Sequence, residues 1–220
     1  MKILLFGATG MVGQGVLREC LNDPEVNEVL SIGRKLTGKK NSKLKEILLR
    51  ELNDLSEAEP HIHDFDACIY CIGSSSAGQS EKTYVETTFH LTKYIADTLI
   101  RLNPNLNFVF GSAAGADPTE KNPVMWAKVK GRTEKMLLEK PFKGIYIFRP
   151  MFIQPLHGIQ SRTNSYRVFY KYTKWLMPLL HKILPSYMTT TEQLGKAMVN
   201  VAKNGSDKTI FESPDFKNLV

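Results

Sequence analysis

The stretch Ile3-Leu4-Leu5-Phe6-Gly7-Ala8-Thr9-Gly10-Met11-Val12-Gly13 decides the fold of this chain. Its four apolar residues predict a strand that is buried on both faces, and the glycines open a segment of helical period. Gly7 permits a tight turn, Gly10 lets the backbone approach a pyrophosphate, and Gly13 lets the helix pack against the strand. An ordinary strand-to-helix turn is the alternative, but a glycine triplet in this context favours nucleotide binding at the helix N-terminus.

Short apolar runs alternate with helical segments along the rest of the chain. The expected strands are residues 3–6, 28–32, 46–49, 67–72, 107–110, 144–148 and 209–211. The expected helices are residues 12–21, 81–102, 123–139 and 190–203. This alternation predicts the α/β fold class, a doubly wound parallel sheet (Rossmann fold) with helices on both faces, as a single domain over residues 1–220.

Residues 151–188 interrupt the alternation, and we expect them to cover the substrate side of a cleft as a lid or insertion. Within them, residues 166–184 carry apolar side chains at helical spacing and basic side chains on another face. Such a helix can lie on an anionic membrane surface. Pro178 should split it, so a lid packed on the domain or on a second subunit is favoured, which leaves a homodimer open.

Composition limits the class of protein. A chain of 220 residues that is 42% hydrophobic can bury one sizeable core. It has no apolar run of membrane-spanning length, no signal-peptide pattern and only three cysteines, so we expect a cytoplasmic location. The formal charge of +7 is spread over many segments rather than one stripe. We therefore expect an anionic small molecule as partner, and no nucleic acid.

The end of the second expected strand indicates which dinucleotide is bound. Proteins that prefer NAD place an acid there, about 20 residues beyond the glycines. Here the position reads Ser31-Ile32-Gly33-Arg34-Lys35, and a guanidinium would pair with a 2′-phosphate. The basic residues 35–45 also fit a solvated loop, but the missing acid favours NADP(H) over NAD(H). Leu52, after the third strand, is expected to line the adenine pocket.

Five short motifs carry a resemblance to a known family. GATGMVG at residue 7, GRK at 33, FGSAAG at 110, VKG at 129 and FRP at 148 follow one another in the order of the atypical short-chain dehydrogenases. The set resembles the NAD-dependent epimerase/dehydratase superfamily and, within it, the small Tat-interacting oxidoreductase-like proteins. The resemblance covers nearly the whole chain.

The family's catalytic residues are a serine after the fifth strand and a Tyr-x-x-x-Lys pair. By resemblance, Ser112 would polarise a carbonyl, and Lys130 would bind the nicotinamide ribose. Trp126 stands at the tyrosine position, and its indole can donate a hydrogen bond but cannot shuttle a proton near neutral pH. The expected catalytic residues are Ser112 and Lys130, and the expected cofactor contacts are Gly7, Thr9, Gly10, Met11, Val12, Gly13, Arg34, Lys35, Leu52, Cys71, Ile72, Gly73, Lys130, Pro150, Phe152 and Ile153.

Two kinds of function follow. The first is an NADP(H)-dependent oxidoreductase or epimerase-like enzyme, in which Ser112 and a substrate or water hydroxyl replace the missing tyrosine. Its partner would be a small organic substrate. The alternative is a catalytically inactive NADP(H)-binding regulator or scaffold, which Trp126 favours.

No metal or redox site is expected. A loop before the fourth strand contains His61, His63, Asp64 and Asp66, but without a second ligand group at suitable spacing. Cys68 and Cys71 are three residues apart, and on a strand such side chains point to opposite faces. The two thiols should not meet.

Overall fold

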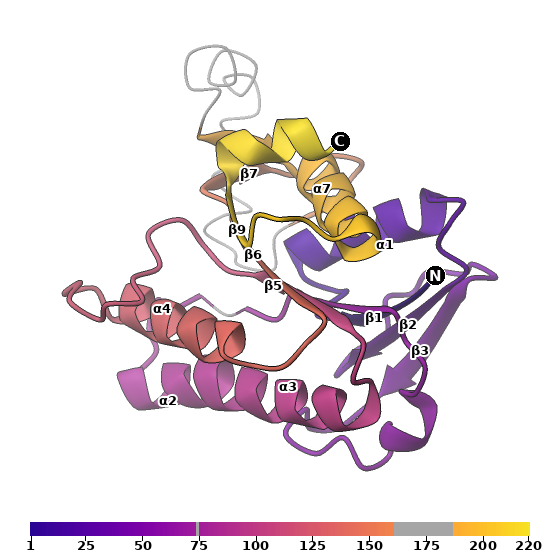
Figure 1. The fold of residues 1–220 in the computed structure, drawn as a ribbon, viewed down its shortest axis with the longest axis horizontal. Coiled ribbons are helices and arrows are strands. Elements are labelled where there is room, and N and C mark those ends of the chain that lie inside the picture. The colour runs from indigo at the N-terminus through magenta and orange to yellow at the C-terminus, as the bar shows by residue number, and fades with distance from the viewer. Residues whose placement is uncertain (74, 161–186) are drawn as a thin grey trace.

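The computed structural model describes residues 1–73, 75–160 and 187–220. Within these ranges it forms a seven-stranded sheet in the order β3-β2-β1-β4-β5-β6-β9, and all neighbouring strands are parallel (Figure 1). The strands are β1 (Lys2–Phe6), β2 (Glu28–Gly33), β3 (Leu44–Leu48), β4 (Ala67–Tyr70), β5 (Asn107–Gly111), β6 (Gly144–Arg149) and β9 (Ile210–Glu212). The strand order reverses between β1 and β4, and open α/β sheets bind their ligands at such a point.

Helices cover both faces of the sheet (Figure 1). One face carries α1 (Met11–Asn22) and α7 (Thr191–Asn204), and the other carries α3 (Leu91–Leu102) and α4 (Met125–Leu138). The shorter helical elements are α2 (Glu81–Val85), η1 (Glu59–His61), the π-helical η2 (Glu86–His90) and the C-terminal η3 (Ser213–Leu219). The doubly wound parallel sheet with helices on both faces is the fold class that the sequence predicts, and it is confirmed.

Strand β1 separates two hydrophobic cores. Ile3 and Leu5 pack into the core beneath α1 and α7, whereas Leu4 and Phe6 pack into the core beneath α3 and α4. All four side chains are fully buried. The uninterrupted apolar run is therefore a strand that is covered on both faces, as predicted.

Several element ends differ from the sequence predictions. The third strand begins at Leu44 rather than residue 46, because Leu44 pairs with Val29 of β2. The fourth strand ends at Tyr70 rather than residue 72, and Cys71 and Ile72 leave the sheet to line the cleft described below. The helix expected over residues 81–102 is interrupted by the π-helical turn η2.

A second, two-stranded sheet lies in the region that interrupts the alternation. β7 (Phe152–Gln154) pairs in parallel with β8 (Met188–Thr190), and neither strand was predicted. Of the expected lid, residues 151–160 and 187–188 belong to the described ranges, whereas the amphipathic pattern over residues 166–184 lies outside them. None of the described helices combines the length and apolar character that crossing a membrane requires.

Candidate functional site

A continuous cleft follows the carboxyl edge of the sheet. A cavity of about 530 Å³ lies beyond β4, β5 and β6, and another of about 450 Å³ lies beyond β1 and β2. Both are lined by Gly10, Cys71, Ile72 and Gly73, so they are two ends of one cleft. The cleft lies at the point where the strand order reverses.

The glycine loop forms the middle of this cleft, and its three glycines have different surroundings. Gly7 has a φ of +84°, and a Cβ there would lie 2.6 Å from the Cys71 carbonyl. A Cβ on Gly13 would lie 2.1 Å from the Gly7 oxygen, so both residues are required by the loop itself. A Cβ on Gly10 would meet only the Gly7 oxygen, at 3.3 Å. Gly10 is therefore approached only by the backbone of its own loop, and it lines both ends of the cleft.

The same loop opens helix α1. The first-turn N–H groups of Met11, Val12 and Gly13 have no acceptor within an α-helix, and the helix dipole makes this end positive. The first turn carries no acidic side chain that would neutralise it. An anion at this end of the helix would be stabilised by the free N–H groups.

The 450 Å³ end of the cleft is basic. Arg34 and Lys35 follow β2, are exposed, and line this cavity together with Thr9 and Leu52. No acidic residue lines it in the part of the chain that the structure describes. The structure thus brings together five regions that the sequence predicts as cofactor contacts: the glycine loop, Arg34, Lys35, Leu52 and residues 71–73.

A third cavity, of about 440 Å³, extends from this end toward α3. It shares Arg34, Leu52, Ile72 and Gly73 with the cleft, and it also includes Asn53, Thr87 and His90. These three residues were missed by the sequence analysis. Asn53 follows Leu52 directly and could have been found from that position, whereas Thr87 and His90 belong to the π-helical turn η2, which the sequence analysis did not predict.

The 530 Å³ end brings together Ser112, Trp126, Lys130 and Pro150. Trp126 and Lys130 lie one turn apart on α4, so the same helix face presents both to the cavity. The Lys130 Nζ lies 5.8 Å from the centre of the Phe110 ring, and Lys130 makes no ion pair with any described residue. Burial lowers the pKa of Lys130 to about 8, while the nearby Glu134 carboxylate opposes this shift.

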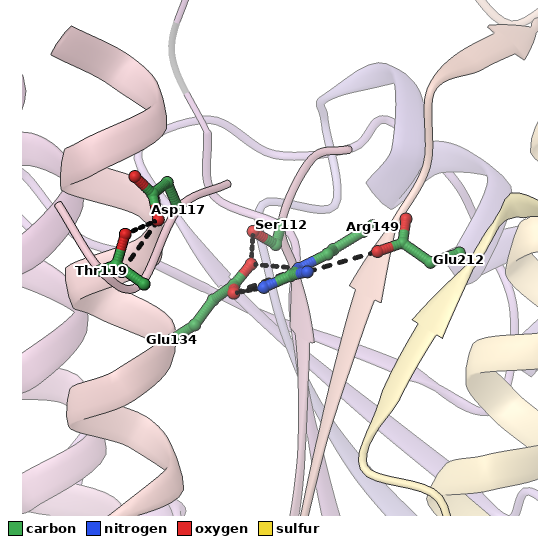
Figure 2. A network of polar contacts seen from close by, with 6 residues as sticks. All are labelled: Ser112, Asp117, Thr119, Glu134, Arg149 and Glu212. Carbon is green, nitrogen blue, oxygen red and sulfur yellow. Dashed lines mark hydrogen bonds and ion pairs between the residues drawn. The ribbon is translucent and has the colours of Figure 1, made fainter. Parts of the chain in front are cut away.

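Ser112 belongs to a buried polar network (Figure 2). Its hydroxyl donates a hydrogen bond to Oε1 of Glu134, which projects from α4 and is 1% exposed. Arg149, at the end of β6, donates to both oxygens of Glu134, with Nη2 2.5 Å from Oε2. The same guanidinium pairs with Glu212 of β9 at 3.3 Å. The network therefore connects the cavity wall at Ser112, directly after β5, with β6, β9 and α4.

Comparisons with known proteins agree with this arrangement. Residues 3–133 match the model of the NAD dependent epimerase/dehydratase family. This chain belongs to that family. The resemblance read from the five sequence motifs is thereby confirmed.

Relatives of this chain are found both by sequence and by structure. The mitochondrial protein FMP52 of Saccharomyces cerevisiae is 28% identical over 97% of this chain and 93% of its own length. The UDP-glucose 4-epimerase of Thermotoga maritima has a TM-score of 0.70 at 15% identity and covers 100% of this chain and 81% of that one. WbmF of Bordetella bronchiseptica, solved with NAD+ and UDP, has a TM-score of 0.71 at 13% identity, covering 96% and 70%. Identities this low establish the fold and leave the activity open.

Two expected contacts of this epimerase/dehydratase family member are not brought to the cleft. Pro150 lines the 530 Å³ cavity, but the side chain of Phe152 is 52% exposed, and Ile153 is buried in the core beneath α1 and α7. Neither residue lines a described cavity of the cleft. The reason is the unpredicted pairing of β7 with β8, which directs alternate side chains outward and into the core.

The same cavity contains residues that the sequence analysis missed. Tyr84 of α2 and Met198 of α7 both line it. Tyr84 is 2% exposed, and burial raises the pKa of its phenol. Its contribution could not be read from the sequence, because no motif marks position 84 and the residue reaches the cavity only through the packing of α2 beside α4.

The described residues of this site include no metal-binding cluster, and the Cys71 thiol that lines the cleft is poorly ionised. No group of three or more His, Cys, Asp or Glu side chains in the described ranges could hold a metal ion. Cys68 lies in the core beneath α3 and α4, whereas Cys71 packs against the opposite core, and both are free. Burial raises the pKa of the Cys71 thiol to about 12, so it is a poor nucleophile at neutral pH.

Proposed function

We propose that this epimerase/dehydratase family member binds NADP(H) along the cleft and is an oxidoreductase acting on a small organic substrate. The observation that carries the proposal is the continuity of the cleft from Arg34 to Lys130 through Gly10. Two similar structures, from Bordetella bronchiseptica and Agrobacterium tumefaciens, hold NAD+ or NAD according to their descriptions. They support a nicotinamide dinucleotide, and the basic end at Arg34 supports the phosphorylated form.

The residues present fit such a cofactor. Gly10 and the first turn of α1 would hold the pyrophosphate, because Gly10 leaves room for it and the helix N-terminus offers free N–H groups. Arg34 and Lys35 would bind the 2′-phosphate, and Lys130 would bind the nicotinamide ribose. The bound nicotinamide would supply or accept a hydride.

Two of the protein's own groups at the 530 Å³ end, Lys130 and Trp126, can only donate hydrogen bonds. With a pKa of about 8, the Lys130 amine is mostly an ammonium at pH 7, and it can hold hydroxyl groups in place. The Trp126 indole can donate one hydrogen bond but cannot transfer its proton. Substrate orientation and exclusion of water are therefore the contributions that these side chains can make.

A second function is favoured by one specific residue. Trp126 occupies the position at which the family has its proton-donating tyrosine, and it lines the cavity. A protein that kept the cleft and lost the proton donor would act as an NADP(H)-binding regulator or scaffold. Its cofactor affinity would be retained, and its turnover would be absent.

Two measurements test these functions. Calorimetric titration with NADPH and NADH measures the affinity for each, and we expect NADPH to bind more tightly. NADPH oxidation is then followed with a panel of quinones, aldehydes and ketones. Turnover of any of them supports the oxidoreductase, tight binding with no turnover supports the regulator, and absence of cofactor binding overturns both.

A homodimer and a cytoplasmic location are carried only by sequence patterns and stay predictions. The yeast relative is named as a mitochondrial protein. Size-exclusion chromatography with light scattering would establish whether two copies associate.

A further inference from the structure

The direction of one hydrogen bond defines what Ser112 can offer a ligand. A serine hydroxyl has one proton to donate and two lone pairs that accept. The Ser112 hydroxyl donates its one hydrogen bond to Glu134, and Ser112 also lines the 530 Å³ cavity. Toward a ligand in the cavity, Ser112 Oγ can therefore only accept a hydrogen bond.

Glu134 is held in place as the acceptor of the Ser112 hydrogen bond. Its side chain is 1% exposed, and Arg149 Nε lies 3.1 and 3.2 Å from its two carboxylate oxygens. A planar guanidinium paired with both oxygens fixes the orientation of a carboxylate. Arg149 is fixed in turn by its pairing with Glu212. A carboxylate in this pairing only accepts hydrogen bonds, so Ser112 has to be the donor.

Two other polar groups of the cavity have the opposite character, whereas the hydroxyls of Ser75, Ser76 and Tyr84, which also line it, can both donate and accept. The Lys130 ammonium and the Trp126 indole donate hydrogen bonds and accept none. A ketone oxygen only accepts hydrogen bonds, so it can accept from Lys130 and Trp126. It cannot donate to the Ser112 oxygen, and its lone pairs would face those of Ser112 without a proton between them. An alcohol hydroxyl can accept from a donor and donate to Ser112 at the same time.

We propose that Glu134 fixes Ser112 as a hydrogen-bond acceptor and that the cavity thereby selects a ligand bearing a donor group, such as an alcohol hydroxyl. Glu134 is then a positioning residue that determines specificity, and it acts through Ser112 without touching the ligand. Identification of this ligand as the substrate rests on the proposed oxidoreductase function. The selectivity itself does not require the cofactor.

A matched pair of unreactive probes tests the selectivity. 4-Fluorophenol can donate a hydrogen bond, whereas 4-fluoroanisole can only accept one, and fluorine NMR titration measures the dissociation constant of each. For the wild-type protein we expect the phenol to bind about threefold to tenfold more tightly than the anisole, the range of one neutral hydrogen bond. In Ser112→Ala this preference should disappear. Equal affinity of the wild type for the two probes, including no measurable binding of either, overturns the proposal.

Glu134→Gln distinguishes positioning from a purely structural role. Its amide oxygen can keep the contact with Arg149, which turns the amide N–H groups toward Ser112 and frees the hydroxyl proton for the cavity. We expect the anisole to gain affinity by about threefold to tenfold, so that the preference approaches one. An unchanged preference in a folded variant contradicts the role of Glu134. If this variant does not fold, the Ser112→Ala result alone decides.

Ser56→Ala is the matched control, because Ser56 is exposed and lines none of the cavities of the cleft. Its phenol preference should equal that of the wild type. All titrations are run with and without saturating NADP+. Loss of NADP+ binding would contradict the proposed function, whereas loss of the probe preference would contradict this inference, so the two failures remain distinguishable.

Discussion

Arg149 at the end of β6 donates hydrogen bonds to both carboxylate oxygens of Glu134 on α4 (Figure 2). The Arg149 side chain is 15% exposed and that of Glu134 is 1% exposed. Each of these buried charges is therefore stabilised by its pairing with the other. The carboxylates of Glu134 and Glu212 raise the pKa of Arg149, while burial opposes that shift. Removal of one partner would leave the other as an uncompensated buried charge.

We therefore expect Arg149→Met to lose about 3 to 5 kcal/mol of unfolding free energy, as measured by urea denaturation. Glu212→Ala is the matched control. It removes the partner of the same guanidinium that is 46% exposed, together with the side-chain cap of η3, and should cost about 0.5 to 2 kcal/mol. Similar losses in the two variants would show that the Glu134 pairing does not dominate.

Gly10 and Gly13 should respond differently to substitution. A Cβ on Gly13 would lie 2.1 Å from the Gly7 oxygen, so Gly13→Ala has to displace backbone and should cost roughly 1 to 3 kcal/mol. In Gly10→Val the Cβ meets only the Gly7 oxygen, a tight contact at 3.3 Å, and the substitution should cost about 1 kcal/mol. Its side chain would nevertheless occupy the space over the helix N-terminus and abolish NADPH binding. Circular dichroism melts and calorimetry measure both effects, and a Gly10→Val protein that still binds NADPH would show that the phosphates lie elsewhere.

Arg34 should determine the preference between the two cofactors. Arg34→Glu removes a charge-assisted contact with the 2′-phosphate and adds repulsion, which should weaken NADPH binding by about 1.5 to 3 kcal/mol. The smaller figure is expected because Arg34 is exposed. NADH affinity should be little changed, and Lys217→Glu, a charge reversal on the exposed C-terminal η3, serves as control. Equal affinity of the wild type for NADPH and NADH would contradict this assignment.

Lys130 should make stability depend on pH in a defined direction. Burial lowers its pKa from 10.5 to about 8, so between these values the unfolded chain holds a proton that the folded protein has lost. The contribution of Lys130 to the free energy of unfolding therefore increases, and the protein becomes more stable, as pH rises from about 8 to 10.5. Below pH 8 its buried charge is destabilising, and Lys130→Met should be more stable than the wild type at pH 7. The difference should be on the order of 1 to 2 kcal/mol, since a half-buried amine keeps part of its hydration.

Urea denaturation at pH 7, 8.5 and 10 measures this difference, which should shrink toward zero as pH rises. Lys135→Met changes an exposed lysine of the same helix and should show no such trend. Parallel pH profiles for wild type and Lys130→Met would mean that the Lys130 amine is hydrated.

The parts of the structure that the sequence predicts are those with local patterns. The strand Lys2–Phe6 and the turn after it follow from neighbouring residues, since the side chains of residues 3–6 each meet a core and the close contact of Gly13 is with Gly7. The same holds for Arg34, which is placed by the end of the strand before it. Trp126 and Lys130 share a helix face through their spacing alone.

The parts that could not be predicted depend on contacts between distant residues. Glu134 reads in sequence as an ordinary charged residue of a helix, yet it is 1% exposed because Ser112 and Arg149, 22 and 15 positions away, supply its partners. The pairing of β7 with β8 involves strands of three residues across an insertion. No periodicity is measurable over such a length, so the displacement of Phe152 and Ile153 from the cleft was not foreseen.

Trp126 provides the most direct test of whether the chemistry of the family survives in this chain. Trp126→Tyr would place a phenol in the cavity beside Lys130, whose ammonium would lower the pKa of the phenol. General acid catalysis of this kind contributes about 10²- to 10⁴-fold in rate, so weak NADPH-dependent carbonyl reduction should increase measurably. The measurement compares kcat/KM for the wild type, Trp126→Tyr and the double variant Trp126→Tyr with Lys130→Ala. Thermal melts of the same proteins show whether the cavity left by the smaller ring lowers stability. A gain that is lost in the double variant would identify a dehydrogenase site that lacks only its acid. No gain in a folded, NADPH-binding variant would favour the regulator, because the substrate end would then differ from the family in more than one residue.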